Sequence, residues 1–300
     1  MKKEAIFHFV LFYVVIFVVM AIFASSASAQ DEYQVWPDKA PGVTENLPSE
    51  MGADGNFKFV TTPIIRVFVP EKKTSDACIM ILPGGAYEIC GNEVVTAKFF
   101  AEHGMTAVLL TYRVPRPKGM AKHIPAFQDA QRAIRLTRSL AEKYGFNPDR
   151  IGAYGGSAGG HLTTMCCTSS SVKSYEPIDE IDKLPANLAF GIAKYPAYVL
   201  EDGRNTANGP DRGNYAKMVD DFVFDAQTCP MCFLHGDSDV YSAMGSVALY
   251  HKLRTMNIPA EVHIWAKAHH GFHGVNEKSQ NQFGYWRQAM WDWIVAMKLN

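Results

Sequence analysis

The chain comprises 300 residues, of which 48% are hydrophobic and 20% are charged. Its 29 Lys and Arg residues balance 30 Asp and Glu residues, so the formal net charge is −1. This composition is typical of a globular protein and excludes a disordered, collagen-like or multi-span membrane chain. A nearly neutral chain also lacks the basic field that nucleic acid requires, so no nucleic-acid partner is expected.

The first 29 residues have the pattern of an export signal. Lys2 and Lys3 precede an apolar run at 5–24, and Ala27-Ser28-Ala29 is a pattern that signal peptidase accepts. We expect cleavage before Gln30, which leaves 271 of the 300 residues and predicts a secreted or periplasmic enzyme. If the segment stayed uncleaved, its apolar run of about 20 residues would just span a bilayer and anchor the chain.

Apolar runs and amphipathic segments alternate along most of the remaining chain, after a segment at 33–59 that is predicted to be an irregular arm or edge segment. The predicted strands are 64–69, 77–82, 106–111, 150–154, 188–195, 231–234 and 260–265. The predicted helices are 93–103, 124–144, 158–168, 243–256 and 280–297. This alternation predicts an α/β fold with one mostly parallel central sheet, covered by helices on both faces.

Residues 30–300 are predicted to form one domain, because no repeat or low-complexity linker divides them. The longest predicted helix, 124–144, carries Ala, Ile and Leu on one face and Arg on the other, and Gly145 is expected to end it. The polar segment 197–228 does not fit the alternation. It is predicted to be a small insertion above the sheet, of a length that suits a small lid.

A GxSxG pattern, Gly155-Gly156-Ser157-Ala158-Gly159, lies between a predicted strand and a predicted helix. The pattern alone is weak evidence, because short glycine and serine patterns arise by chance. Its position between strand and helix is more specific, since such a turn lifts the serine hydroxyl above the sheet at the positive end of the helix. Ser157 is therefore the predicted nucleophile.

A nucleophilic serine needs a base that is oriented by a third group. Asp237 and Asp239 follow one predicted strand, and His269, His270 and His273 follow the next. The order Ser, Asp, His, with each member after a strand, is known from α/β-hydrolases. Spacing favours Asp239 as the acid and His270 as the base and leaves their neighbours open as alternatives.

Acyl transfer also needs donors for the oxyanion, each contributing about 2.7–4 kcal/mol. A predicted strand is followed by the segment Pro83-Gly84-Gly85-Ala86-Tyr87. Its glycines leave backbone N–H groups accessible near the strand-to-helix turn at Ser157, which we call the elbow. The N–H group of Ala158, at the start of the predicted helix, is the second expected donor. An ordinary glycine-rich turn is the alternative interpretation.

Several segments together resemble the exported bacterial α/β-hydrolases of the acetylxylan-esterase type, which are related to the hormone-sensitive lipases. They are 35–42, 83–87, 125–138, 147–161, 235–239 and 270–272. The resemblance covers nearly the whole chain after the export signal. It implies the α/β-hydrolase fold, with a mostly parallel sheet, helices on both faces and a small lid insertion.

The resemblance also implies roles for individual residues. Ser157 would be the nucleophile, Asp239 the acid and His270 the base, with backbone donors at Gly85, Ala86 and Ala158. The lipase relatives have His-Gly-Gly-Gly where this chain has Pro83-Gly84-Gly85-Ala86. This departure weakens the case for a lipid substrate and leaves open which of Gly84, Gly85 and Ala86 donates to the oxyanion.

These features predict an exported serine esterase that removes acetyl or feruloyl groups from plant polysaccharides such as xylan, or from their oligosaccharides. A short insertion favours a shallow site that accepts a short acyl group on a large alcohol. Tyr87, Tyr195 and Tyr198 are candidates for contact with a sugar ring, with wall or core positions as the alternative. The mechanism requires no metal and no organic cofactor.

Three other functions remain open: a general short-chain carboxylesterase acting on small esters, an aminopeptidase-like serine hydrolase, and a non-catalytic carbohydrate-binding protein. The presence of all three triad residue types argues against the last. The spacing Cys229-Pro-Met-Cys232 also occurs in redox and zinc sites, but here it runs into a predicted buried strand without a second ligand pair. We interpret the six cysteines as structural or free thiols.

Overall fold

The structure is a computed structural model that describes residues 29–201, 217–272 and 285–300. The predicted export signal at 1–29 lies outside these residues except for its last position. Among the described residues, no helix combines the length and the apolar character needed to cross a membrane.

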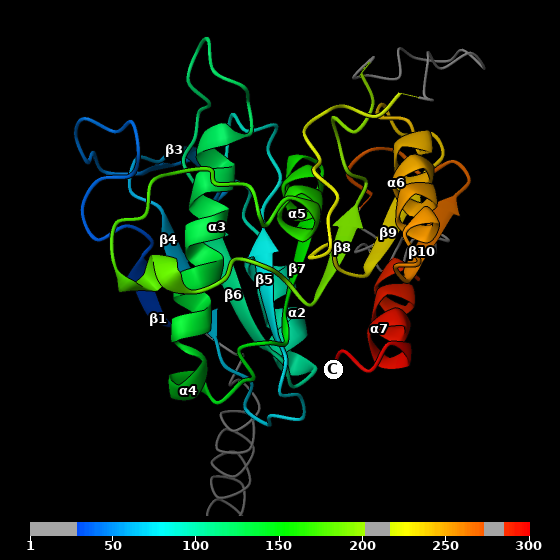
Figure 1. The fold of residues 1–300 in the computed structure, drawn as a ribbon, viewed down its shortest axis with the longest axis horizontal. Coiled ribbons are helices and arrows are strands. Elements are labelled where there is room, and N and C mark those ends of the chain that lie inside the picture. Colours follow the sequence, from blue (N-terminus) through cyan, green and yellow to red (C-terminus); the bar gives the residue numbers. More distant parts are fainter. Residues whose placement is uncertain (1–28, 202–216, 273–284) are drawn as a thin grey trace, which may run out of the picture.

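An eight-stranded sheet forms the centre of the molecule (Figure 1), with the strand order β1-β4-β6-β5-β7-β8-β9-β10. The strands are β1 (Ala29–Gln34), β4 (Ile64–Phe68), β5 (Cys78–Leu82), β6 (Thr106–Thr111), β7 (Ile151–Gly156), β8 (Phe190–Lys194), β9 (Met231–Gly236) and β10 (Ala260–Trp265). The six strands from β6 to β10 in this order are mutually parallel, whereas β4 runs antiparallel to β1 and β6. The predicted mostly parallel sheet is confirmed.

Helices cover both faces of this sheet, as predicted. On one face α3 (Ile124–Ser139), α5 (Ala158–Thr168) and α6 (Met244–Thr255) share a core with the sheet. On the other face α2 (Val94–Glu102) and α7 (Trp286–Ala296) contribute to a second core. The strands β5 to β9 are buried along their whole length, which explains why their sequences are continuous apolar runs.

The segment predicted to be an irregular arm is more ordered than its composition indicated. Its beginning belongs to the edge strand β1, and further along β2 (Glu50–Met51) pairs with β3 (Phe57–Phe59) in a small hairpin. The indole N–H of Trp36 donates a 2.8 Å hydrogen bond to the buried carboxylate of Asp129 in α3. This contact fixes the arm to the helix layer.

The predicted helix at 124–144 is interrupted. α3 ends at Ser139, and its C-cap Leu140 has a ψ of 1°. The short α4 (Ala141–Tyr144) follows and is ended by Gly145, a C-cap in the left-handed conformation, as predicted. The arginine face of α3 is also more buried than an amphipathic pattern implies. Arg132 is 2% exposed because it forms ion pairs with Asp179 and Asp182, near the 3₁₀ helix η1 (Glu180–Lys183).

The described ends of the predicted insertion at 197–228 lie side by side. The N–H group of Val219 donates a 3.0 Å hydrogen bond to the Val199 carbonyl, next to an antiparallel bridge between Leu200 and Met218. The described parts on either side of 202–216 therefore meet at one place. Residues 202–216 lie outside the described part.

All six cysteines belong to the described residues, and all six are free and buried. Burial raises the pKa of the Cys232 thiol and likewise raises the pKa of Cys166. A buried thiol with a raised pKa is a poor nucleophile and redox group. The spacing of Cys229 and Cys232 thus belongs to the start of β9 and its packing.

Candidate active site

Ser157 occupies a sharp turn between β7 and α5. Its φ of 58° and ψ of −123° lie in a region that a residue with a side chain rarely adopts. The turn needs small neighbours, because a Cβ atom on Gly155 would lie 2.2 Å from the carbonyl oxygen of Gly159. A Cβ atom on Gly159 would lie 2.0 Å from the carbonyl oxygen of Leu82 in β5. The glycines of the GxSxG pattern therefore make the elbow sterically possible.

His270 lies beside this serine on the loop that follows β10. The distance between Ser157 Oγ and His270 Nε2 is 2.8 Å. The rings of Tyr195 and Tyr241 pack around the imidazole, with centroids 4.9 and 5.0 Å from it. The aromatic contacts hold the ring while its side chain stays 25% exposed, so that a substrate or water can reach it.

Asp239, on the loop after β9, lies next to the other ring nitrogen of His270. Its two carboxylate oxygens lie 2.8 and 2.9 Å from His270 Nδ1. The carboxylate is buried, and its Oδ1 atom also accepts a 2.8 Å hydrogen bond from the backbone N–H of Tyr241. An ionised carboxylate in this position favours the imidazole tautomer that carries its proton on Nδ1 and leaves Nε2 facing the serine.

The sequence left Asp237, His269 and His273 open as alternatives for the acid and the base. Asp237 is exposed, and His269 is exposed with its Nδ1 atom 3.2 Å from the carbonyl oxygen of Ser238. His273 lies outside the described residues. Among the described residues, the structure therefore brings together Ser157, His270 and Asp239, the set favoured by spacing.

The topology of the sheet explains this convergence. Ser157, Asp239 and His270 follow β7, β9 and β10, which are parallel, so their carboxyl ends meet at one edge of the sheet (Figure 1). Open parallel sheets bind their ligands at this edge. Residues far apart in the sequence are thereby positioned by rigid strands.

The segment after β5 passes directly beneath the elbow. A Cβ atom on Gly84 would lie 2.7 Å from the carbonyl oxygen of Gly156 and 3.3 Å from Ser157 Cβ. Gly85 has a φ of 127° and would clash with the carbonyl oxygen of Ile89 if it carried a side chain. Ala86 follows with a φ of 58°. This close approach places the backbone of Gly84, Gly85 and Ala86 beside the serine.

Ala158 is the first residue of α5. The N–H groups in the first turn of a helix have no acceptor within the helix, so that of Ala158 is available to an anion above the elbow. The segment 84–86 and the start of α5 thus flank the serine from two sides. Backbone segments on two sides of a nucleophile are the parts from which oxyanion sites are built.

The three candidate tyrosines differ in exposure. Tyr87 is 1% exposed, and its hydroxyl lies 2.8 Å from Nδ1 of His161. Tyr195 is 4% exposed and packs against His270. Tyr198 is half-buried, and its ring stacks on that of Tyr87. Tyr87 and Tyr195 therefore lie in the wall of the site, whereas Tyr198 retains a surface that a ligand can contact.

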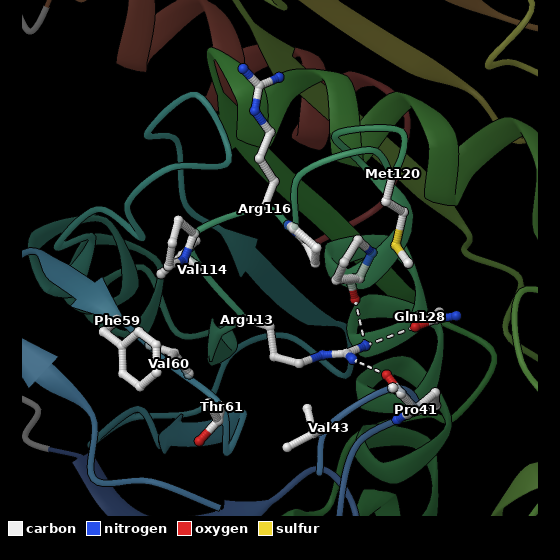
Figure 2. A pocket seen from close by; sticks show the side chains of 14 residues that line it. Pro41, Val43, Phe59, Val60, Thr61, Arg113, Val114, Arg116, Met120 and Gln128 are labelled. Carbon is white, nitrogen blue, oxygen red and sulfur yellow. Dashed lines mark hydrogen bonds between the residues drawn. The ribbon is translucent and has the colours of Figure 1, made fainter. Parts of the chain in front are cut away.

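A cavity of about 450 Å³ lies between the arm and the loop after β6 (Figure 2). Its lining is mostly apolar and includes Val43, Phe59 and Met120. Arg113 in its wall is neutralised by Asp129, at 2.9 Å. The N–H group of Arg116, on the same wall, donates a 2.9 Å hydrogen bond to the Tyr87 carbonyl. The cavity therefore adjoins the segment that passes beneath the elbow.

Two buried basic residues near the site had no role in the sequence-based interpretation. Burial lowers the pKa of His161 to about 4, and it lowers the pKa of Lys194 to about 7. The Lys194 ammonium lies 3.6 Å from the centre of the Trp286 ring, and the Lys194 carbonyl accepts the Ser157 N–H at 3.0 Å. His161 is the last residue of the segment 147–161 that carries the family resemblance, one helical turn after the serine. Lys194 lies in an apolar run that gave no signal of a functional residue.

A solved hydrolase structure shares this fold. The structure of an acetyl ester-xyloside bifunctional hydrolase from Caldicellulosiruptor lactoaceticus superimposes with a TM-score of 0.70 and 22% identity, covering 92% of this chain and 99% of that one. The chain has the α/β-hydrolase fold. The fold implied by the sequence resemblance is thereby confirmed for the protein.

Sequence comparisons add relatives whose names are more specific than the fold. Residues 65–192 match the family model described as BD-FAE. The chain is 24% identical over 279 residues to endo-1,4-beta-xylanase B of Butyrivibrio fibrisolvens, with 86% of this chain covered. It is also 24% identical over 223 residues to an acetylxylan esterase of Xylanibacter ruminicola, with 68% of this chain covered. The resemblance to acetylxylan esterases is confirmed, and the matches span 42% of each relative's length.

Proposed function

We propose that this α/β-hydrolase is an exported serine esterase that removes short acyl groups, acetyl or feruloyl, from plant polysaccharides such as xylan or from their oligosaccharides. The observation that carries the proposal is the row of contacts from Ser157 to His270 to Asp239, each between 2.8 and 2.9 Å. The names of the relatives, an acetylxylan esterase and a xylanase, support the substrate class.

In the first half of the reaction, Ser157 Oγ attacks the ester carbonyl while His270 Nε2 accepts its proton. Asp239 orients the imidazole and stabilises its charged form without taking the proton. The new oxyanion accepts hydrogen bonds from the N–H group of Ala158 and from Gly85 or Ala86. Collapse of the tetrahedral intermediate breaks the ester C–O bond, and His270 donates its proton to the leaving sugar alcohol.

In the second half, a water molecule enters beside His270. The imidazole accepts a proton from this water as it attacks the acyl-enzyme carbonyl. A second tetrahedral intermediate then breaks the bond to Ser157 Oγ, which recovers its proton from His270. The products are the free carboxylic acid and the deacylated sugar.

The architecture around the serine also supports a short acyl group. Only 36 residues, 195–230, separate β8 from β9, which suits a small lid better than a deep acyl tunnel. The half-buried ring of Tyr198 offers an aromatic surface of the kind that packs against sugar rings. Export follows from the signal pattern at the N-terminus and is tested by N-terminal sequencing, which should begin at Gln30 in the mature protein.

The test is release of acetate from acetylated xylan by the wild type and by Ser157→Ala. We expect the variant to lose at least about 1,000-fold in kcat, because the remaining groups supply no nucleophile. Equal activity of the two proteins would disprove the mechanism. A panel of acetylated xylan, acetylated mannan, methyl ferulate and short p-nitrophenyl esters separates the polysaccharide esterase from a general short-chain carboxylesterase.

A further inference from the structure

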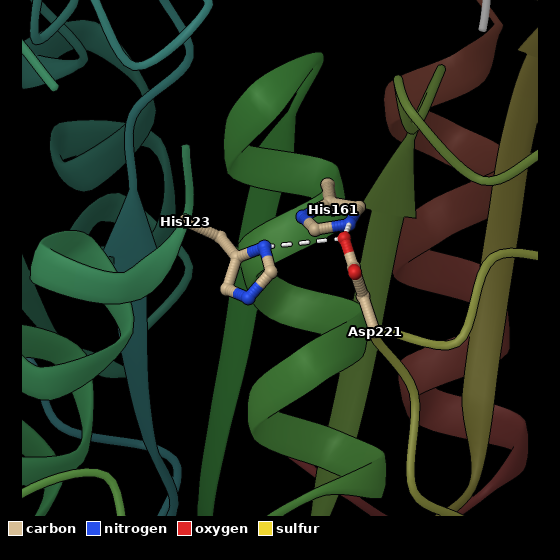
Figure 3. A group of neighbouring side chains, drawn as sticks. All are labelled: His123, His161 and Asp221. Atoms are coloured by element: carbon tan, nitrogen blue, oxygen red, sulfur yellow. Dashed lines mark hydrogen bonds and ion pairs between the residues drawn. The ribbon is translucent and has the colours of Figure 1, made fainter. Parts of the chain in front are cut away.

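Three side chains outside the proposed triad converge on one point (Figure 3). His123 precedes α3, His161 lies in α5, and Asp221 lies in the segment that returns from the insertion. Asp221 Oδ2 is 3.1 Å from His123 Nδ1 and 3.2 Å from His161 Nε2. All three potential ligand atoms lie within 4.8 Å of one another.

We propose that His123, His161 and Asp221 form a binding site for a divalent transition-metal ion, with zinc as the best match. Two imidazoles and one carboxylate are a common ligand set for zinc, with bonds of about 2.0–2.2 Å. Neighbouring ligand atoms in a tetrahedral site of this size lie about 3.3 Å apart. The two distances from Asp221 are already close to this value. A small rotation of the partly exposed His123 ring brings its nitrogen to a similar distance from His161 Nε2.

The surroundings of the two histidines favour metal binding. The hydroxyl of Tyr87 lies 2.8 Å from the other ring nitrogen of His161, which fixes the orientation of the imidazole in the way that partners of metal ligands do. His161 is fully buried, so its imidazole is enclosed by the protein and its orientation is fixed by its neighbours. Nδ1 of His123 is buried and makes no hydrogen bond of acceptable geometry, although Asp221 is near.

An ion can reach this cluster from solvent. A cavity of about 380 Å³ is lined by His123, Asp221 and residues of α3 and α5 such as Phe127 and Met165. The cavity leaves room for a water molecule as the fourth ligand. A proposed metal site requires such an entry path in addition to suitable ligands.

The ammonium group of Lys122 would compete with a metal ion for the Asp221 carboxylate. Its ammonium group lies 3.8 Å from the same oxygen of Asp221 and 4.6 Å from the centre of the Tyr198 ring. Without a metal, Lys122 supplies the positive charge that the Asp221 carboxylate needs, and the N–H group of His161 can donate to that carboxylate. Removal of the lysine charge should therefore strengthen metal binding.

The bound ion would connect the insertion to the nucleophile helix. Asp221 belongs to the returning end of the insertion, His161 lies one turn of α5 after Ser157, and its partner Tyr87 belongs to the segment beneath the elbow. The site takes no part in the proposed acyl transfer. It is a structural metal site beside the active site, so its occupancy is measurable independently of esterase activity.

The experiment is calorimetric titration of the EDTA-treated full chain with ZnCl₂. We expect one zinc ion per wild-type chain and per Ser157→Ala chain. His123→Gln and Asp221→Asn should each weaken binding at least about tenfold, because each removes a ligand. Lys122→Gln keeps all three ligands and should bind zinc more tightly than the wild type. Titration with Co²⁺ should give the absorption bands of a tetrahedral site in the wild type and not in His123→Gln.

A matched control is His263→Gln, which removes a surface histidine that pairs with Glu261 at 2.6 Å. Its zinc affinity should equal that of the wild type. The proposal is overturned if the wild type binds no zinc, if His123→Gln binds it as tightly as the wild type, or if His263→Gln loses it. Since Lys122→Gln leaves the ligands intact, weaker binding by that variant would also contradict the proposal.

Discussion

Asp239 faces His270 with both of its carboxylate oxygens, at 2.8 and 2.9 Å from the same ring nitrogen. Asp239→Asn should therefore lower kcat by about 10⁴-fold, because an amide no longer selects the tautomer that accepts the serine proton. Initial rates with a short p-nitrophenyl ester measure this loss. Asp237→Asn is the matched control on the same loop, and its exposed side chain predicts a rate near that of the wild type.

The two neighbouring histidines differ in their contacts. His270→Ala should abolish turnover to a similar degree as Ser157→Ala, because Nε2 of this ring is the group within 2.8 Å of the serine hydroxyl. His269→Ala should retain the activity, since its ring is exposed and lies near the Ser238 carbonyl. A fluorophosphonate probe that labels Ser157 equally well in His270→Ala and in the wild type would contradict the assignment.

The elbow is expected to tolerate no side chain at Gly155. A Cβ atom there would meet backbone oxygens of Gly159 and Leu82 at 2.2 and 2.7 Å, so Gly155→Ala should cost at least about 3 kcal/mol of stability and displace Ser157. Urea unfolding and esterase rates measure the two effects. Gly119→Ala is the comparison: Gly119 has a φ of +79° with open space around it, and its cost should be about 1–2 kcal/mol.

His235 should make the fold sensitive to mild acid. Its buried ring lies 2.7 Å from the Ser246 hydroxyl and 3.0 Å from the Tyr241 carbonyl, and burial lowers the pKa of His235 from 6.5 to about 4. Between these two values the unfolded chain binds more protons than the folded one. The free energy of unfolding therefore decreases as the pH falls through this window, by at most about 3 kcal/mol.

Urea unfolding of the wild type and of His235→Gln across that window checks this prediction. The variant lacks the titrating ring, so its free energy of unfolding should fall less steeply with decreasing pH. The comparison of slopes stays informative even if the variant is less stable at every pH. Identical slopes would show that other groups cause the acid sensitivity.

The sequence predicted the central strands better than the periphery. β6 occupies the predicted range 106–111, because a strand covered on both faces needs a continuous apolar run. The hairpin of β2 and β3 was missed, since its residues are largely exposed and carry no apolar alternation. The break at Leu140 was also missed, because the hydrophobic spacing continues through it into α4.

The candidate site, too, was predictable only in part. The elbow and the order of the triad residues are local patterns, so Ser157 was predictable, and spacing favoured Asp239 and His270 over their neighbours. A wall or core position was the stated alternative for Tyr87, but its partner was not predictable, because its hydroxyl contacts His161, 74 positions away. The same holds for His123, His161 and Asp221, which have no spacing typical of a metal motif and meet only through the fold.

The position of β10 has a consequence for how this protein would lose activity. β10 is half-buried along most of its length and pairs with β9 alone among the described strands, yet the loop after it carries His270. Local opening of such a strand needs less free energy than global unfolding. Heating should therefore inactivate the enzyme before its core melts, and amide protons of β10 should exchange with solvent faster than those of β5 or β7.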